Sequence, residues 1–233
     1  TAYYAKVLKE NTVLALDLLS DILQNSTFDA DELERERTVV IQEIGQAHDT
    51  PDDLIFDHFQ TVAFPDQPLG RPVLGSVETV GNMPRETIMG HMSAGYGGDR
   101  MVLSAAGNLE HDAFVQAASD LFDKIPPQAQ VAMEAGHYEG GHHFEDRELE
   151  QVHLLLGFSG LSYEDDQFYA TSVMSTLFGG GMSSRLFQEI RERRGLVYSI
   201  YSYPSFYRDC GLFGIYAGTG PEDVVELLPA ICE

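Results

Sequence analysis

The chain has 233 residues, which is enough for one large domain or two small ones with sizeable cores. Its 14 basic and 37 acidic residues give a net charge of −23, and so acidic a surface repels nucleic acid and anionic membrane lipids. We therefore expect no nucleic acid and no membrane as a partner, and no apolar run reaches the roughly 18 residues of a membrane-spanning helix. Two cysteines, Cys210 and Cys232, are too few for a disulfide framework or a cysteine-rich metal site.

The first part of the chain is predicted to combine helices with two strands. Alternating side chains over 1–8 indicate a strand, and apolar residues at helical spacing indicate a helix over 12–24. Asp29 and Glu32 resemble a capping box, which predicts the start of a long charged helix that ends near residue 47. The other predicted elements are a helix from Pro51, a loop over 64–70, a short helix from Pro84, a strand over 99–107 and a helix over 111–124.

Residues 126–148 differ from the sequence on either side. Two prolines, scattered glycines and no periodic apolar pattern predict a linker there, or a linker with an irregular strand. Each side of this linker mixes helices with antiparallel-type strands, so we expect an α+β fold of two units. The elements predicted after the linker are a strand over 152–158, helices over 167–178 and 183–193 with a flexible glycine break at 179–181, strands over 197–203 and 212–217, and a helix from Pro221.

Both ends of the sequence lack the usual signals of a terminus. The chain opens at Thr1 without a methionine and already in a strand pattern. It stops inside a helical pattern without a C-cap glycine. We therefore expect it to be an internal piece of a longer protein.

Three histidines, His137, His142 and His143, fall within the predicted linker. A metal site is one interpretation, but their glycine-rich surroundings provide no helix or strand to fix a tetrahedral geometry, and no cysteine joins them. A solvated linker is the interpretation we favour. The other five histidines stand alone in the sequence and are expected to be surface or hydrogen-bonded residues: 48, 58, 91, 111 and 153.

The charged helix over 29–47 carries the first candidate site. Residues seven apart on a helix lie on nearly the same face, about 10.5 Å apart along the axis, so Glu36 and Glu43 project in one direction beside an apolar stripe. A carboxylate beside a buried face needs a cation, a donor or a metal as its partner. The alternative is a solvated acidic face paired with Arg35 and Arg37.

The second candidate site lies where the predicted helix 183–193 gives way to a strand. Four of the 14 basic residues fall within ten positions there, and the helix is expected to end near Gly195. Arg191 and Tyr198 can then converge across the turn, where a guanidinium and a phenol suit an oxyanion or a peptide carbonyl. The alternative is a set of arginines at a helix C-terminus, where the macrodipole favours cations.

At these two segments the sequence resembles the zinc peptidases of the pitrilysin, insulinase and mitochondrial processing peptidase family, in its bacterial, processing-peptidase-like branch. The resemblance covers nearly the whole chain in order. Residues 1–6 resemble the strand after the family's zinc helices, and the Glu-Arg-Glu-Arg helix is similar to its third-ligand helix. Further similarities are 56–58 with 67–75, 99–103, and the run 183–187 with Arg191 and Tyr198, which looks like the start of the family's second homologous half.

The resemblance implies a fold, an activity and residue roles. It implies two homologous α/β sandwich units with mixed, largely antiparallel sheets, with residues 1–125 in the zinc-binding half and 149–233 in the second. The activity is that of a zinc metalloendopeptidase, which hydrolyses peptide bonds with a zinc-activated water. Glu43 is the third zinc ligand, and Glu36 orients the zinc-binding histidines. Arg191 and Tyr198 reach across from the second half to hold the substrate and the transition-state oxygen.

One motif of the family is missing from this sequence. The inverted His-x-x-Glu-His motif, which supplies two zinc ligands and the general base, is expected about 70–80 residues before Glu43, upstream of Thr1. We therefore expect this chain alone to be inactive and to bind zinc only weakly through Glu43, because one carboxylate is far short of a tetrahedral site.

Two other functions stay open on the sequence. One is a non-catalytic partner or scaffold subunit of the same family, and the other is an acidic peptide-binding module. Keeping both Glu36 and Glu43 favours catalysis, because a scaffold has no need of that pair. The expected partner is a peptide or protein substrate, and the whole protein can be a homodimer or a heterodimer. The sequence favours a soluble protein of the bacterial cytoplasm or periplasm over a membrane protein.

Overall fold

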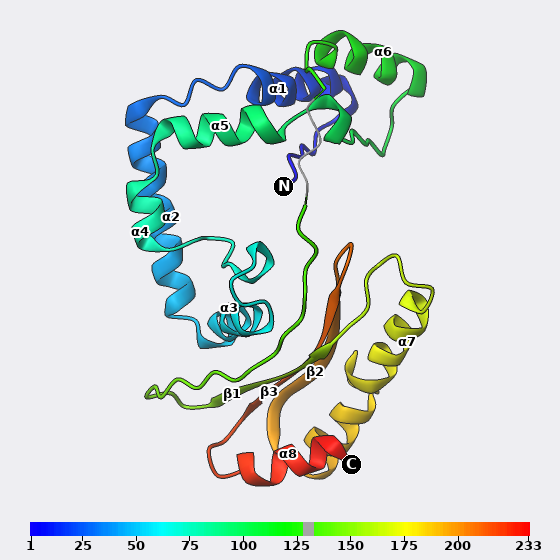
Figure 1. Ribbon diagram of the computed structural model, residues 1–233. Helices are drawn as coiled ribbons and strands as arrows, with labels where there is room; N and C mark the ends of the chain where they lie inside the picture. Colours follow the sequence, from blue (N-terminus) through cyan, green and yellow to red (C-terminus); the bar gives the residue numbers. More distant parts are fainter. Residues whose placement is uncertain (128–132) are drawn as a thin grey trace. The chain divides into compact units, whose positions relative to one another are not determined.

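A computed structural model describes residues 1–127 and 133–233 of the chain (Figure 1). The chain divides into two compact units. The first comprises Thr1–Val40 and Glu78–Ala132, and the second comprises Ile41–Val77 and Met133–Glu233. The predicted α+β class is confirmed, because the chain contains many helices and, in the second unit, an antiparallel sheet. Among the described residues, no helix is both long and apolar enough to cross a lipid bilayer.

The first unit is built from helices. Leu16 of α1 is buried. Two side chains of α1 form hydrogen bonds with α6: Ser20 Oγ donates to the Leu121 carbonyl at 3.0 Å, and Gln24 Nε2 donates to the same oxygen at 2.9 Å. The elements of this unit are η1 (Lys9–Asn11), α1 (Thr12–Gln24), the first part of α2 (Ala30–His48), α4 (Val77–Asn82), α5 (Arg85–Gly95), η3 (Gly98–Arg100) and α6 (His111–Phe122).

Two of the predicted strands are wrong. Residues 1–8 form no strand, and the segment 99–107 begins in η3 and continues without a strand. A strand is stabilised by a ladder of hydrogen bonds to a neighbour, and neither segment has such a neighbour among the described residues. The side chains that suggested strands are in part exposed instead, as at Tyr4 (89%) and Val102 (94%).

The second unit contains a three-stranded sheet. Its strands are β1 (Val152–Ser159), β2 (Val197–Phe206) and β3 (Gly211–Thr219), in the order β1-β3-β2. Both pairs are antiparallel, so β3 lies between the other two. Val152 of β1 and Val197 of β2 are both opposite Thr219. The sheet therefore brings together the starts of two strands that are 45 residues apart in the sequence (197 − 152).

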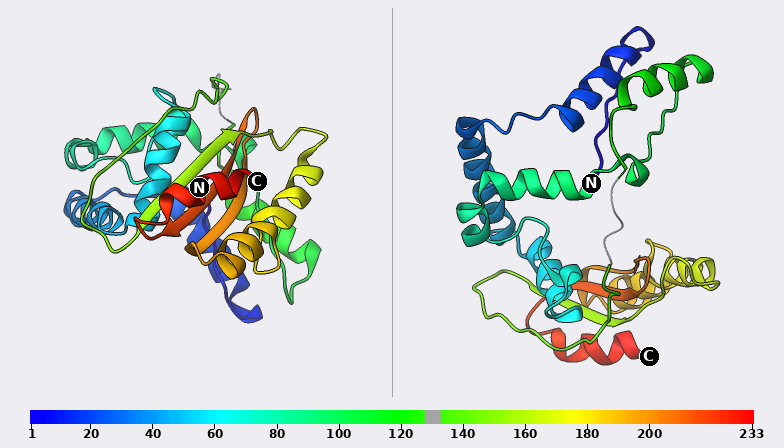
Figure 2. Two further views of the ribbon diagram at one scale, coloured as in Figure 1. Left: turned by 90° about the horizontal axis from the view of Figure 1, so that it is seen from below. Right: turned by 45° about the horizontal axis from the view of Figure 1, so that its top comes forward.

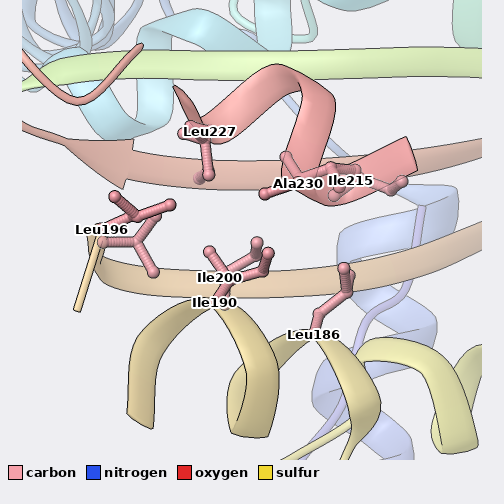
Figure 3. Packing of buried hydrophobic residues seen from close by; sticks show 10 residues of the cluster. Leu186, Ile190, Leu196, Ile200, Ile215, Leu227 and Ala230 are labelled. Carbon is pink, nitrogen blue, oxygen red and sulfur yellow. The ribbon is translucent and has the colours of Figure 1, made fainter. Parts of the chain in front are cut away.

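Helices cover both faces of this sheet. In Figures 1 and 2, α7 (Phe168–Gly179) and α8 (Val224–Cys232) lie on one side and α3 (Pro51–Ala63) lies on the other. Alternate residues of β2 and β3 face α8 and form the main core (Figure 3), whose buried members are Leu186, Ile190, Leu196, Val197, Ile200, Ile215, Ala217, Leu227, Ala230 and Ile231.

The opposite face of the sheet is aromatic. Phe56 of α3 packs on Tyr203 and Tyr216, with ring centroids 5.6 and 5.7 Å apart. Side chains alternate along a strand, so the tyrosines of β2 and β3 fall on this face while the isoleucines fall on the other. The sheet is consequently buried on both sides over much of β3.

The helices predicted after the linker are mostly confirmed. Residues 168–179 form α7, and the final helix begins at Val224, three residues later than predicted, because Pro221 and the two residues after it form a turn. The predicted helix 183–193 takes an unusual form, described below.

Residues 133–148 contain neither helix nor strand. They nevertheless form hydrogen bonds with the end of α3 and with the residue before η2 (Pro68–Gly70). The Glu139 N–H donates to the Ala63 carbonyl at 3.0 Å, and the Gln67 side chain exchanges two hydrogen bonds of 2.8 Å with the His137 backbone. The part of the predicted linker at 128–132 lies outside the described residues.

Candidate functional site

The helix that carries the two candidate carboxylates begins where the sequence predicted. Asp29 Oδ1 accepts hydrogen bonds from the backbone N–H groups of Asp31 at 2.9 Å and Glu32 at 3.2 Å. These bonds satisfy two N–H groups that have no partner inside the helix. α2 then runs without interruption past Glu36 and Glu43, so both glutamates are placed by one helix.

Both carboxylates are exposed, and neither has a partner among the described residues. Arg35 and Arg37, the partners considered in the sequence, each pair instead with the glutamate three residues before them. Across residues 1–127 and 133–233, no hydrogen bond or ion pair engages Glu36 or Glu43. Glu36 belongs to the first unit and Glu43 to the second. Each carboxylate is therefore open to a ligand or partner that this part of the chain does not supply.

Arg191 lies on a π-helix. The segment η4 (Phe187–Arg193) has π-helical hydrogen bonding, and the Arg194 N–H donates to the Glu189 carbonyl five residues back at 3.2 Å. Such turns are rare and are frequent at functional sites. The Arg191 guanidinium carbon is 4.7 Å from the Phe187 ring centroid, and its Nη1 is 3.9 Å from Glu192 Oε1. Its side chain thus lies along its own helix, 41% exposed.

The predicted turn after this helix is present at Gly195. Its φ of +68° is in the left-handed region, which glycine adopts without a steric penalty and which commonly ends a helix. The Leu196 N–H donates to the Ile190 carbonyl at 3.1 Å, and the buried Thr219 Oγ1 donates to the Leu196 carbonyl at 2.5 Å. Both backbone polar groups of Leu196, the residue before β2, are therefore hydrogen-bonded, which fixes where the strand starts.

Tyr198 stands at a bulge in β2. Val197 pairs with Thr219 and Ser199 pairs with Gly218, so Tyr198 has no partner residue on β3. A bulge leaves one residue outside the ladder and often redirects its side chain next to a functional site. Tyr198 is 64% exposed, whereas its neighbour Val197 is buried. The bulge presents the phenol to solvent.

The phenol of Tyr198 lines a shallow hollow of about 450 Å³ in the second unit. On its wall, His153 Nδ1 and the Tyr216 hydroxyl are 2.8 Å apart, and burial raises the pKa of Tyr216. The residues around the hollow are Pro51, Asp52, Leu149, Glu150, Gln151, His153, Tyr198, Ser199 and Tyr216.

His153, expected to be a surface or hydrogen-bonded residue, does form a hydrogen bond, but its place beside Tyr198 was not predicted. No motif links the two, because only the order β1-β3-β2 brings residue 153 near residue 198. Of the four predicted site residues, the hollow includes Tyr198 and not Glu36, Glu43 or Arg191.

The donor atoms of these residues decide what metal the site can hold. Glu43 has the chemistry of a zinc ligand, since carboxylate oxygens bind zinc and its own are exposed and without a partner in the part of the chain that the structure describes. A catalytic zinc site takes three protein ligands, however, and the sequence contains no His-x-x-Glu-His motif. The chain therefore fits one position of such a site.

Two sequence models of one protein family match the chain almost end to end. The model described as insulinase (peptidase family M16) matches residues 1–77, and the model described as the peptidase M16 inactive domain matches residues 82–233.

Curated bacterial proteins are similar over the same length. An uncharacterized zinc protease of Rickettsia bellii is 43% identical over 231 residues, which are 99% of this chain and 56% of the relative. An uncharacterized zinc protease of Bacillus subtilis is 39% identical over 234 residues, 100% of this chain and 57% of the relative. The chain thus spans about half the length of the curated relatives it matches.

Solved structures share the fold. The peptidase M16 inactive domain from Pseudomonas fluorescens has a TM-score of 0.85 and 22% identity, over 93% of this chain and 54% of that one. A chain of complex III2 from Candida albicans has a TM-score of 0.81 and 20% identity, over 93% and 54% of the two chains. At these identities the likeness concerns the fold alone.

Proposed function

Because the chain belongs to the M16 family of peptidases, we propose that the whole protein is a zinc metalloendopeptidase that hydrolyses peptide bonds in a peptide or protein substrate. The names of the curated relatives, which are zinc proteases, support this proposal. The observation that carries it on this chain is the pair of exposed, unpaired carboxylates, Glu36 and Glu43, on one helix.

In this proposal the two carboxylates divide the work of a metal centre. Glu43 is one zinc ligand, and Glu36, two helical turns earlier, accepts a hydrogen bond from a ligand histidine and so fixes its ring orientation. Zinc, when bound, supplies Lewis acidity and activates a water for attack on the peptide carbonyl. The remaining ligands and the general base are assigned to a His-x-x-Glu-His motif that this sequence does not contain.

Tyr198 and Arg191 are proposed to hold the substrate. The phenol of Tyr198 leaves the sheet at a bulge, and it can donate a hydrogen bond to the carbonyl oxygen that gains negative charge during attack. The Arg191 guanidinium can donate two hydrogen bonds to a peptide carbonyl once it leaves the Phe187 ring.

Three variants of the whole protein test these assignments by steady-state kinetics and metal analysis. Glu43→Gln should remove the zinc of this centre, which is one equivalent per chain. Tyr198→Phe should retain zinc and lower kcat by about 10²–10³, the usual effect of losing one such donor. Arg191→Ala should raise KM and retain zinc.

Each variant has a matched control. Glu32→Gln changes an exposed carboxylate on the same helix, Tyr169→Phe removes a phenol that is 79% exposed on α7, and Arg193→Ala removes a helix-end cation that is 74% exposed. All three controls should retain zinc, kcat and KM. Full zinc content in Glu43→Gln would refute the ligand assignment. Unchanged kcat in Tyr198→Phe together with unchanged KM in Arg191→Ala would leave their segment purely structural.

A non-catalytic subunit is the second candidate function. It is favoured by the fold likeness to a chain of complex III2 and by the family model described as an inactive domain. A catalytic protein carries the His-x-x-Glu-His motif and loses one equivalent of zinc when Glu43 is changed to Gln, whereas a scaffold subunit lacks the motif, keeps its zinc content in Glu43→Gln, and forms a stable complex with a partner. Metal analysis and size-exclusion chromatography of the whole protein separate the two. An acidic peptide-binding module, the third candidate, binds peptide equally well with and without zinc.

The proposal also includes the organisation expected from the sequence. Residues 1–125 belong to a zinc-binding half and 149–233 to a second, homologous sandwich, with 126–148 as the linker. The lack of helix and strand in 133–148 supports a linker there, whereas the compact unit formed by Ile41–Val77 and Met133–Glu233 includes residues from both proposed halves. Limited proteolysis of the whole protein should cut first within 126–148, and a first cut elsewhere would contradict these boundaries.

A further inference from the structure

Three side chains of types that can ligate a metal lie close together in the second unit, and none of them is Glu36, Glu43, Arg191 or Tyr198. His58 lies on α3, and His143 and Glu145 lie in the segment 133–148 that runs beside this helix. One ligand atom from each of the three side chains is within 4.8 Å of the other two. The cluster joins residues 85 and 87 positions apart in the sequence (143 − 58 and 145 − 58), so no sequence spacing reveals it.

The geometry of the cluster is close to that of a coordination site. His58 Nε2 is 3.1 Å from Glu145 Oε2, and two ligand atoms on a tetrahedral ion with bonds near 2.1 Å lie about 3.4 Å apart. A metal ion can thus take the place of the hydrogen between His58 Nε2 and Glu145 Oε2, with the displaced proton released to solvent. The His143 ring stacks on the His58 ring with centroids 4.3 Å apart.

The surroundings allow an ion to enter and the ligands to adjust. The side chains of His58 and Glu145 are 32% and 38% exposed, and His143 is exposed. The exposed His143 side chain can change rotamer and bring a ring nitrogen closer to the other two ligand atoms, which lie within 4.8 Å of it. The net charge of −23 raises the local concentration of cations.

One cation already touches the cluster. Arg147 Nε lies 3.8 Å from Glu145 Oε1, while its Nη1 donates to the His48 carbonyl at 3.0 Å. Arg147 therefore engages the carboxylate oxygen that His58 does not use. Glu145 Oε2, the oxygen that faces His58, is not contacted by Arg147 and is left available to a metal.

We propose that His58, His143 and Glu145 form a binding site for a divalent transition-metal ion, with zinc as the test ion. Two imidazoles and one carboxylate are ligands that suit zinc, and three protein ligands leave an open position for water. This site is separate from the zinc centre proposed for the whole protein, because it uses none of that centre's residues.

The experiment is a titration of this chain with zinc alone, monitored by isothermal titration calorimetry, after removal of any polyhistidine tag. One zinc should bind per chain. His143→Ala and Glu145→Gln should each weaken binding by at least about tenfold, since even indirect partners of a metal contribute that much. Zinc should also raise the melting temperature of the unchanged chain, and this rise should disappear in His143→Ala.

The chain offers a neighbouring control for each variant. His142→Ala and Asp146→Asn alter exposed residues beside the ligands that are outside the cluster, and each should change the affinity less than twofold. Glu43→Gln should leave this binding unchanged. A failure of the His58–His143–Glu145 site can therefore be distinguished from a failure of Glu43 as the catalytic zinc ligand. An equal loss in His142→Ala and His143→Ala would overturn the proposal, and so would zinc binding that survives both ligand substitutions.

Discussion

The glycine triplet 179–181 gives the sharpest test of how the second unit is packed. The sequence predicted a flexible break there, but Gly179 ends α7 directly against β2. A Cβ atom at Gly179 would lie 2.3 Å from the backbone nitrogen of Ser202 and 2.6 Å from its Oγ. Ser202 is buried, and its Oγ donates to the Ser175 carbonyl at 3.0 Å, so neither atom can move without loss.

We expect Gly179→Ala to destabilise the chain by about 1–3 kcal/mol, the usual cost of overpacking a well-packed core. For a domain of this size that is about 2–4 °C of melting temperature for each kcal/mol. Because the chain has no tryptophan, unfolding in urea is best followed by far-ultraviolet circular dichroism, with the midpoint and the slope reported separately.

Gly181→Ala is the matched control, since a Cβ there would meet nothing within 4 Å and its φ is not left-handed. It should leave the free energy of unfolding unchanged or raise it by about 0.4–1 kcal/mol, because alanine lowers the conformational entropy of the unfolded chain. Equal destabilisation by both substitutions would refute the packing argument and restore the interpretation of a flexible break. A Gly179→Ala variant as stable as the unchanged chain would refute it as well.

Three further predictions concern single side chains of the second unit. Thr219→Val should lower the free energy of unfolding by about 1–3 kcal/mol in urea, because it leaves the buried Leu196 carbonyl without this donor; an unchanged midpoint would contradict the role of that bond. The free energy of unfolding should fall as the pH rises above about 10, because burial raises the pKa of Tyr203 and the folded state keeps a proton that the unfolded state loses. The fall should be smaller in Tyr203→Phe. Iodoacetamide should alkylate the exposed Cys232 faster than Cys210, whose thiol pKa is raised by burial and by Asp209; equal rates by mass spectrometry would contradict this.

Features encoded within one element could be predicted from the sequence. Asp29 is followed by N–H groups that its side chain can cap, and the structure has that cap. Gly195 precedes a strand and follows a helix, and it adopts the left-handed φ that such a junction requires. The helices beginning near Thr12 and Pro51 follow from apolar spacing and from proline's fixed φ in a first helical turn.

Features that depend on a neighbouring segment could not be predicted. Residues 1–8 have strand composition, but composition cannot supply the neighbour with which a ladder forms. The π-helix of η4 has the same apolar spacing as an α-helix, so periodicity did not distinguish them. The bulge at Tyr198 exists only because Val197 and Ser199 pair with consecutive residues of β3.

The two groups of candidate ligands differ in the same way, and this difference decides how each is best tested. Glu36 and Glu43 share one helix, so their common direction follows from spacing alone, and what is missing is the partner they serve. His58 and Glu145 are already within hydrogen-bond distance of one another, but only because residues 133–148 return alongside α3. The first pair therefore needs an experiment on the whole protein, where the other zinc ligands are proposed to reside. The second needs only this chain and zinc, because all of its proposed protein ligands are within the described residues.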